Sequence, residues 1–211
     1  MLCAEVDHIT IVAPTLAAGV EHVRRKLGVT PQMGGEHPRM GTHNRLLKLG
    51  PKIYLEVIAI NPDAPPPVRP RWYGLDQFGA DQEPRLATWI VRTSDIEGAA
   101  VASPVNLGAV EDMTRGALHW RITIPPDGSL PLGGIAPTLI QWPVDTHPAD
   151  SMPDLGCALM EIEAFHPDPA QVSAVLAAIG FDGKFRVDVL QRDRRPYLMA
   201  HIQSPLGNVS L

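Results

Sequence analysis

One structural unit occurs three times in this sequence, and the repeat restricts the fold more than any other feature. The first copy begins at residues 7–15, where alternating side chains indicate a β-strand that leads directly into a helix. Thr15 is a suitable N-cap, and apolar residues follow it at spacings of three and four, as in a helix packed on a sheet. Gly28 then stands where a helix end favours a left-handed residue.

The same unit is found again at residues 86–108 and 159–180, with matching spacing. Seven residues separate the equivalent strand position from the helix start in each copy: His8 to Thr15, Thr88 to Asp95 and Glu161 to Asp168. From the helix start to the glycine after the helix, the steps are thirteen, thirteen and twelve residues. Matching steps at three places indicate three copies of one module, in which His8, Thr88 and Glu161 are equivalent.

Segments with strand patterns follow each helix, so that the predicted module is β-α-β-β-β. The strongest strand is residues 52–60, which are rich in β-branched residues. The sequence therefore predicts an α+β fold of three repeated modules, with similar strand order and one helix on the same face of each. The predicted division is a first module at 1–60, a linker at 61–84, a second module at 85–143, a linker at 144–156 and a third module at 157–211.

Composition argues against two classes of partner. Twenty-three acidic against eighteen basic residues give a net charge of −5, which argues against nucleic acid and anionic membranes as partners. The chain opens with no basic, apolar leader and holds no apolar run long enough to span a bilayer. Cys3 and Cys157 are too few for a disulfide framework. We therefore expect a reduced, cytoplasmic protein, and a homodimer is one option for its oligomeric state.

Glu56 is the strongest single indication of a functional site, because it interrupts the apolar strand 52–60. A buried carboxylate needs a metal ion, a hydrogen-bond donor or solvent, and the alternative is that Glu56 lies on the solvated face of an edge strand. Strand alternation places His8 and Thr10 on one face and Asp7 on the other. His8 is then a metal ligand, a general base or a histidine hydrogen-bonded at a strand start.

Polar residues on two further strands are candidates for the same site. His43 and Asn44 are neighbours and point to opposite faces, so only one faces a site, and we predict His43. Arg121 lies on an apolar strand and needs an acidic partner, either Glu56 or a substrate carboxylate. Three tryptophans either line an apolar pocket or belong to the core: Trp72, Trp120 and Trp142.

The motifs of the first two modules resemble a known family. They are Asp7-His8, Gly41-Thr42-His43-Asn44, Tyr54-Leu55-Glu56-Val57-Ile58, Trp120-Arg121 and Leu139-Ile140-Gln141-Trp142. Together with the repeat, they resemble the vicinal oxygen chelate superfamily, the fold of glyoxalase I and the extradiol dioxygenases, and more narrowly its glyoxalase-like domain family. The resemblance implies that the first two modules form a cupped half-barrel and that the third is an accessory copy.

The resemblance also implies a divalent metal ion in the cup. Matched position by position, the metal ligands are His8 and Glu56, a pair suited to Zn, Fe, Mn or Ni. The second module departs from the pattern, with Thr88 where a histidine is expected and Gln141 where a glutamate is expected. A nucleotide cofactor is not expected.

The function that the resemblance implies is an enzyme acting on a small oxygenated or carbonyl-bearing metabolite, as a lyase, isomerase or dioxygenase. Glu56 and His43 are the predicted catalytic residues. The predicted substrate-binding residues are Asn44, Arg121, Gln141 and Trp142, with Trp72 from the proline-rich linker as a partial lid. The alternative is a metal-free protein that binds or sequesters a small molecule in the same cup.

Overall fold

In the computed structural model, which describes residues 2–143, 147–191 and 193–211, all three predicted helix starts carry a side-chain cap. The caps are Thr15, which accepts from the amide of Ala18, Asp95, which accepts from Gly98, and Asp168, which accepts from Gln171. The helices are α1 (Leu16–Leu27), α2 (Ile96–Ala102) and α3 (Pro169–Ala178). Helix α2 ends earlier than its repeat spacing predicts, because Pro104 disfavours helical backbone at Ser103.

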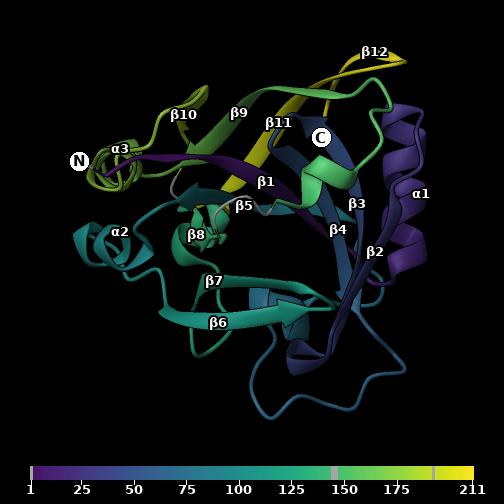
Figure 1. Cartoon of the computed structure of the whole chain (residues 1–211). Helices are drawn as coiled ribbons and strands as arrows, with labels where there is room; N and C mark the ends of the chain where they lie inside the picture. The colour runs from purple at the N-terminus through teal and green to yellow at the C-terminus, as the bar shows by residue number, and fades with distance from the viewer. Residues whose placement is uncertain (1, 144–146, 192) are drawn as a thin grey trace.

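The first two modules form one curled sheet of eight strands (Figure 1). Its strands are β1 (Ala4–Val12), β2 (Gln32–His37), β3 (Thr42–Gly50), β4 (Ile53–Ile60), β5 (Arg85–Thr93), β6 (Ala109–Arg115), β7 (Leu118–Ile124) and β8 (Thr138–Gln141). The order β2-β3-β4-β1-β5-β8-β7-β6 is symmetrical about β1 and β5, which pair antiparallel, while each pairs parallel with the last strand of its own module. The predicted cupped half-barrel is confirmed.

The two edges of this sheet curve back toward each other. Arg39, which follows β2, donates to the carbonyl oxygen of Asp112 on β6 at 2.9 Å and pairs with Glu111. The concave face is therefore enclosed on several sides, and side chains that point into it are withdrawn from bulk water.

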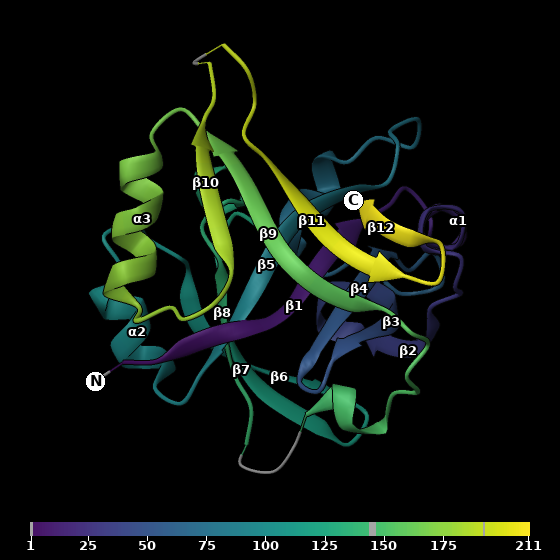
Figure 2. The same cartoon turned by 90° about the horizontal axis from the view of Figure 1, so that it is seen from above.

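The third module repeats the order of elements along the chain but not the order of strands in the sheet. Its strands are β9 (Ala158–His166), β10 (Phe185–Val189), β11 (Tyr197–Ser204) and β12 (Gly207–Ser210), and their order is β10-β9-β11-β12 (Figure 2). The prediction of a similar strand order is wrong for this copy. The four-residue strand β12 folds back on β11 as a tight hairpin. Strand β11 therefore pairs with β12 on one side and with β9 on the other, and β10 pairs with the remaining edge of β9.

The eight-stranded sheet has an apolar cluster on each face. On the convex face, β-strand residues pack against the three helices and the third module. On the concave face, residues of β4, β5, β7 and β8 pack with the linker segment η2 (Trp72–Gln77). Three further short 3₁₀ segments connect strands: η1 (Pro38–Met40), η3 (Pro131–Gly134) and η4 (Pro148–Ser151).

Of the predicted linkers, 61–84 contains η2, with Trp72 and Tyr73 buried. The first three residues of the linker 144–156 lie outside the described residues. None of the helices in the described part of the chain combines the length and apolar character that crossing a bilayer demands.

Trp89 on β5 joins the eight-stranded sheet to the third module, and its replacement by Phe tests that junction. The buried Trp89 ring stacks on Phe185 with centroids 4.7 Å apart, and its indole N–H donates to the carbonyl oxygen of Ile135 at 2.8 Å. Trp89→Phe leaves that carbonyl without its donor, so we expect the free energy of unfolding to fall by about 1–3 kcal/mol in urea denaturation. If Trp89→Phe unfolds with the same urea midpoint and slope as the wild type, the Trp89 hydrogen bond does not stabilise this junction.

Candidate active site

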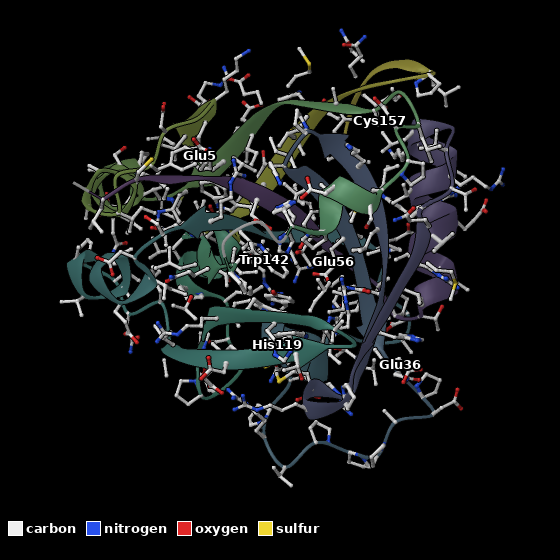
Figure 3. All side chains as sticks on the ribbon, viewed as in Figure 1. Glu5, Glu36, Glu56, His119, Trp142 and Cys157 are labelled. Carbon is white, nitrogen blue, oxygen red and sulfur yellow. The ribbon has the colours of Figure 1, made fainter. Side chains whose placement is uncertain are left out.

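Glu56 of β4 points into the concave interior of the curled sheet and is almost fully buried (Figure 3). Its Oε1 accepts a hydrogen bond of 2.5 Å from the amide nitrogen of Asn44 on β3, and its Oε2 accepts one of 3.3 Å from the hydroxyl of Thr10 on β1. His8 Nε2 lies 3.8 Å from Glu56 Oε2. Two ligands of one first-row metal ion lie within about 5 Å of each other, and His8 and Glu56 meet that condition.

A β-bulge in β1 brings Asp7 to the same site as His8. The β1–β5 pairing shifts register between Val6 and His8, so that Asp7 has no partner across the ladder. Such an extra residue turns its side chain away from regular alternation. Asp7 Oδ1 therefore lies 2.6 Å from His8 Nδ1, and the prediction that Asp7 faces the opposite side of the sheet is wrong.

Asp7 holds a network of three donors. Its Oδ2 accepts from the indole nitrogen of Trp142 at 2.9 Å and contacts His147 Nε2 at 3.1 Å. His147 Nδ1 accepts from the amide of Ala149, so the ring proton of His147 is on Nε2 and is donated to Asp7. Burial by itself raises the pKa of Asp7, but the hydrogen bonds from His147 and His8 outweigh it and hold that pKa well below the usual range.

The contact with Asp7 decides which nitrogen of the His8 ring faces the cavity. His8 Nδ1–H donates its hydrogen bond to Asp7 Oδ1. The other ring nitrogen, Nε2, is therefore the atom that can exchange a proton with a group in the cavity. Tyr54 stacks on the His8 ring with centroids 4.4 Å apart, which fixes the plane of the imidazole. Burial raises the pKa of the Tyr54 hydroxyl well above its ordinary value, so this residue is neutral.

Aromatic side chains surround the Glu56–His8 pair and leave little free space. The cavity beside Glu56 has a volume of about 20 Å³, enough for one water-sized group. Besides the polar residues already named, its walls are His37, Trp72, Tyr73, Trp120, Ile122, Ile140, Trp142 and the partly exposed Arg115. A polar group bound in this cavity is removed from water and surrounded by mostly apolar side chains. Electrostatic interactions are stronger there than in water because the local dielectric constant is low.

The comparison with known families agrees with this architecture. A family model described as a glyoxalase-like domain matches residues 6–180. The chain belongs to the glyoxalase-like domain family. Its fold is accordingly that of the vicinal oxygen chelate superfamily, as the motifs predict. A search of curated proteins finds no match.

Several solved structures are similar to this glyoxalase-like chain at low sequence identity. Methylmalonyl-CoA epimerase of Streptomyces coelicolor is 21% identical, with 67% of this chain and 99% of the epimerase covered and a TM-score of 0.45. The epimerase of Mycobacterium tuberculosis is 18% identical over 65% of this chain and 87% of its own, with a TM-score of 0.44. A 4-hydroxymandelate synthase mutant of Streptomyces coelicolor is 12% identical over all of this chain and 62% of its own, with a TM-score of 0.54.

Four of the predicted site residues of this glyoxalase-like protein line the cavity, namely His8, Glu56, Trp72 and Trp142, and Asn44 reaches it through Glu56. Trp72 and Trp142 are part of the wall. Asn44, not His43, faces Glu56, so alternation along β3 directs the His43 ring to the opposite, helix-facing side.

Arg121 and Gln141 lie on the opposite face of the sheet from Glu56. Arg121 pairs with Glu97 of α2, and the Gln141 side chain accepts from the amide of Ile96 at the start of the same helix. Their strand neighbours Trp120, Ile122, Ile140 and Trp142 face the cavity instead. Because side chains alternate between the two faces of a strand, an inward direction predicted one residue out of step places Arg121 and Gln141 on the wrong face.

Sequence reasoning did not identify several residues of the site, namely Thr10, His37, Tyr73 and His147. His147 lies in a proline-rich connector far along the chain, with no local pattern to mark it. A usable signal existed only for Asp7, since a carboxylate inside the apolar strand 4–12 needs donors if it is buried.

The metal ion that the family resemblance implies can be tested against the donors present. His8 and Glu56 form a pair, but the second module faces them with apolar and aromatic side chains and with Arg115, which are not metal ligands. The Thr88 hydroxyl lies 3.5 Å from the carbonyl oxygen of Trp89. The described ranges contain no group of three His, Cys, Asp or Glu side chains arranged to hold a metal. Catalytic metal centres held by proteins use three ligands or more, so this set does not fit a resident metal ion.

His37 makes the stability of the protein depend on pH. Burial, followed by the nearby charge of Arg115, lowers the pKa of His37 to about 3, so the folded state keeps this ring neutral. An unfolded histidine binds a proton near pH 6.5, so the stability that His37 contributes is complete above that pH and is lost as the pH falls toward 3. We expect His37→Gln to reduce the slope of unfolding free energy in this window by up to about 1.4 kcal/mol per pH unit.

The measurement is urea unfolding at several pH values between 3 and 7. His119→Gln is the matched control, because His119 is exposed on β7 and its replacement should leave the slope unchanged. Equal slopes for the wild type and His37→Gln contradict the role assigned to His37.

Proposed function

We propose that this protein is an enzyme that moves a proton on a small oxygenated or carbonyl-bearing metabolite, with Glu56 and His8 as the proton-transferring pair. The observation that carries the proposal is the 3.8 Å approach of His8 Nε2 to Glu56 Oε2 in an aromatic cavity, with His8 oriented by the charged Asp7. Two groups of this kind on one cavity are what general acid–base catalysis requires. Membership of the glyoxalase-like domain family supports an enzyme but does not choose the reaction.

The proposed step is enolisation of the substrate. The Glu56 carboxylate removes a proton from a carbon next to a carbonyl group, and the electron pair of the broken C–H bond moves to the carbonyl oxygen. The imidazolium form of His8, stabilised by Asp7, donates a hydrogen bond from Nε2 to that oxygen. Return of the proton to either face of the carbon, or to a neighbouring atom, gives an epimerisation or an isomerisation.

Asn44 and Thr10 serve as positioning residues in this scheme. Their hydrogen bonds to the two carboxylate oxygens hold Glu56 in one orientation. The cavity volume of about 20 Å³ admits only the reacting atoms, so binding of a whole substrate requires Trp72 and Tyr73 of η2 to move. The substrate class is therefore small at its reacting end.

Isotope exchange tests the proposal without knowledge of the net reaction. The purified wild-type protein is incubated in D₂O with a panel of 2-hydroxy and 2-oxo carbonyl compounds, and loss of C–H signals is followed by proton NMR. We expect at least one compound to exchange faster than in buffer alone. Binding of a compound without exchange of any panel member supports the alternative, a metal-free binding protein, and overturns the enzymatic proposal.

The same sample tests the divalent metal that the family resemblance implies and that the donors at His8 and Glu56 do not fit. Elemental analysis for Zn, Fe, Mn and Ni, repeated on His8→Ala, shows whether an ion copurifies and whether it depends on His8. A cytoplasmic location and a homodimer stay predictions, which fractionation and sedimentation measure directly.

A further inference from the structure

A second, much larger cavity lies apart from Glu56, on the other side of the linker segment that holds Trp72 and Tyr73. It has a volume of about 920 Å³, within the range of small-molecule sites. Its walls come from α1, from residues 74–86, from the chain around η3 and from β11 with the end of β12. Helix α1 and strand β12 lie side by side at one end of the molecule in both views (Figures 1 and 2). We call this cavity the α1–β11 groove.

Positive charge gathers along the α1–β11 groove without matching acids. Lys26, Arg85 and Arg195 line it, while Glu83 is the one acidic side chain among the lining residues. No salt bridge joins any of these three cations to a carboxylate in the ranges that the structure describes. Burial, followed by the charge of Arg195, lowers the pKa of Arg85, and both arginines line the same groove.

Unpaired like charges beside each other are unfavourable, and an anion placed between them removes the repulsion. His22 of α1 adds a second indication, because its Nδ1 is buried and has no hydrogen-bond partner in the described part of the chain. A buried polar atom that lacks a partner is rare in folded proteins and suggests a missing one. The polar side of the groove thus presents the three cationic side chains.

The rest of the groove is apolar. Leu86, Leu130, Leu198 and Leu211 line it, and Phe78 lies beneath the Arg85 guanidinium, 5.7 Å from the ring centroid. A cationic side chain over an aromatic ring next to a leucine-lined wall suits a ligand with a charged head and a hydrocarbon body. The third module contributes Arg195 and Leu198 to this surface, so the groove exists only because that module packs against the first two.

We propose that the α1–β11 groove binds an amphipathic organic anion, with its carboxylate or phosphate head between Arg85 and Arg195 and its hydrocarbon body against Phe78 and the leucines. The proposal is independent of the reaction at Glu56. It gives the third module a role in ligand binding, since this module supplies one of the two arginines.

The test is isothermal titration of the full-length protein with four probes: decanoate, decyl phosphate, hexanoate and the uncharged 1-decanol. We expect decanoate or decyl phosphate to bind at least tenfold more tightly than 1-decanol, because the arginines recognise the head. We also expect decanoate to bind at least tenfold more tightly than hexanoate, because four methylene groups more are buried. Which of the two charged probes binds better identifies the head group.

Variants locate the site. Arg85→Gln combined with Arg195→Gln is expected to weaken binding of the charged probe at least tenfold and to leave 1-decanol within twofold. Arg194→Gln is the matched control, because Arg194 is the exposed neighbour of Arg195 and does not line the groove. Chemical-shift changes on titration should include the backbone amides of Gly74 and Gly133, which lie in the groove walls.

Three results overturn the proposal. They are equal affinity for decanoate and 1-decanol, an equal loss of affinity in Arg194→Gln and in the double variant, and no binding of any probe. Glu56→Gln is titrated in parallel and should bind the charged probe as the wild type does. Loss of probe binding in Glu56→Gln places the probe at the Glu56 cavity instead, so failure here is distinguishable from failure of the proposed reaction.

Discussion

Replacement of Glu56 by Gln is expected to lower the rate of C–H exchange by about 10²–10⁴-fold, the usual contribution of a positioned general base. The change removes the charge that accepts the proton and little else. A glutamine oxygen still accepts the hydrogen bond that Asn44 donates to Glu56, and the side chain keeps its length and volume. We therefore expect a folded protein that binds substrate but does not exchange its proton.

The measurement is the exchange rate by proton NMR, together with thermal unfolding to confirm that the variant is folded. Glu36→Gln is the matched control, because Glu36 lies on the nearby strand β2 but is exposed and directed away from the cavity (Figure 3). The control should exchange at the wild-type rate. A Glu56→Gln rate within threefold of the wild type rules Glu56 out as the base.

Replacement of Asp7 by Asn is expected to destabilise the protein by about 3–5 kcal/mol, the cost of breaking a buried charged network by removing one partner. Asp7 is fully buried and accepts from His8, Trp142 and His147. An asparagine offers one acceptor oxygen and an NH₂ group, so at least one of these donors faces another donor. His8 also loses the partner that holds its proton at Nδ1, so exchange should slow as well.

The destabilisation by Asp7→Asn should depend on pH in a defined direction. The pKa of Asp7 is lower in the folded than in the unfolded state, so its contribution is complete above the ordinary carboxyl pKa of about 3.9. That contribution is lost as the pH falls below this value toward the folded-state pKa. The difference in unfolding free energy between the wild type and Asp7→Asn should therefore be constant from pH 7 to 5 and shrink below about pH 4.

Urea unfolding at several pH values measures this difference. Asp112→Asn is the matched control, since the Asp112 side chain is almost fully exposed, and a change of less than about 0.5 kcal/mol is expected. A difference between the wild type and Asp7→Asn that stays the same at pH 3 and pH 7 contradicts an ionised, hydrogen-bonded Asp7.

Sequence reasoning was most successful where the information is local. The caps at Thr15, Asp95 and Asp168 and the segments with strand periodicity need only neighbouring residues, because hydrogen bonds and alternation act over a few positions. The repeat then multiplied these local signals and identified the architecture. The family resemblance, matched position by position, then paired His8 with Glu56, and the two side chains do lie together.

Sequence reasoning was less successful for features that depend on the register or the order in which strands pair. The helix-facing positions of His43, Arg121 and Gln141 follow from registers that the sequence does not encode locally, and one step of register exchanges the two faces of a strand. The third module shows the same limit at the level of topology. Its elements follow the expected order along the chain, but the edge of β9 that each later strand occupies is decided by hairpin length and packing.

The sequence by itself determined the repeated α+β modules, because repeats, caps and strand periodicity act within short stretches of chain. The motifs on these modules carried the resemblance to the glyoxalase-like family, and that resemblance implied the cupped two-module sheet and the pairing of a histidine with a glutamate inside it. Only the tertiary structure decided that Asp7 turns inward at a bulge and that His147 meets it from 140 positions away along the chain. It also decided that the third module closes the α1–β11 groove. These features arise from contacts between segments distant in sequence, whose free energy depends on the complete packing rather than on any local pattern.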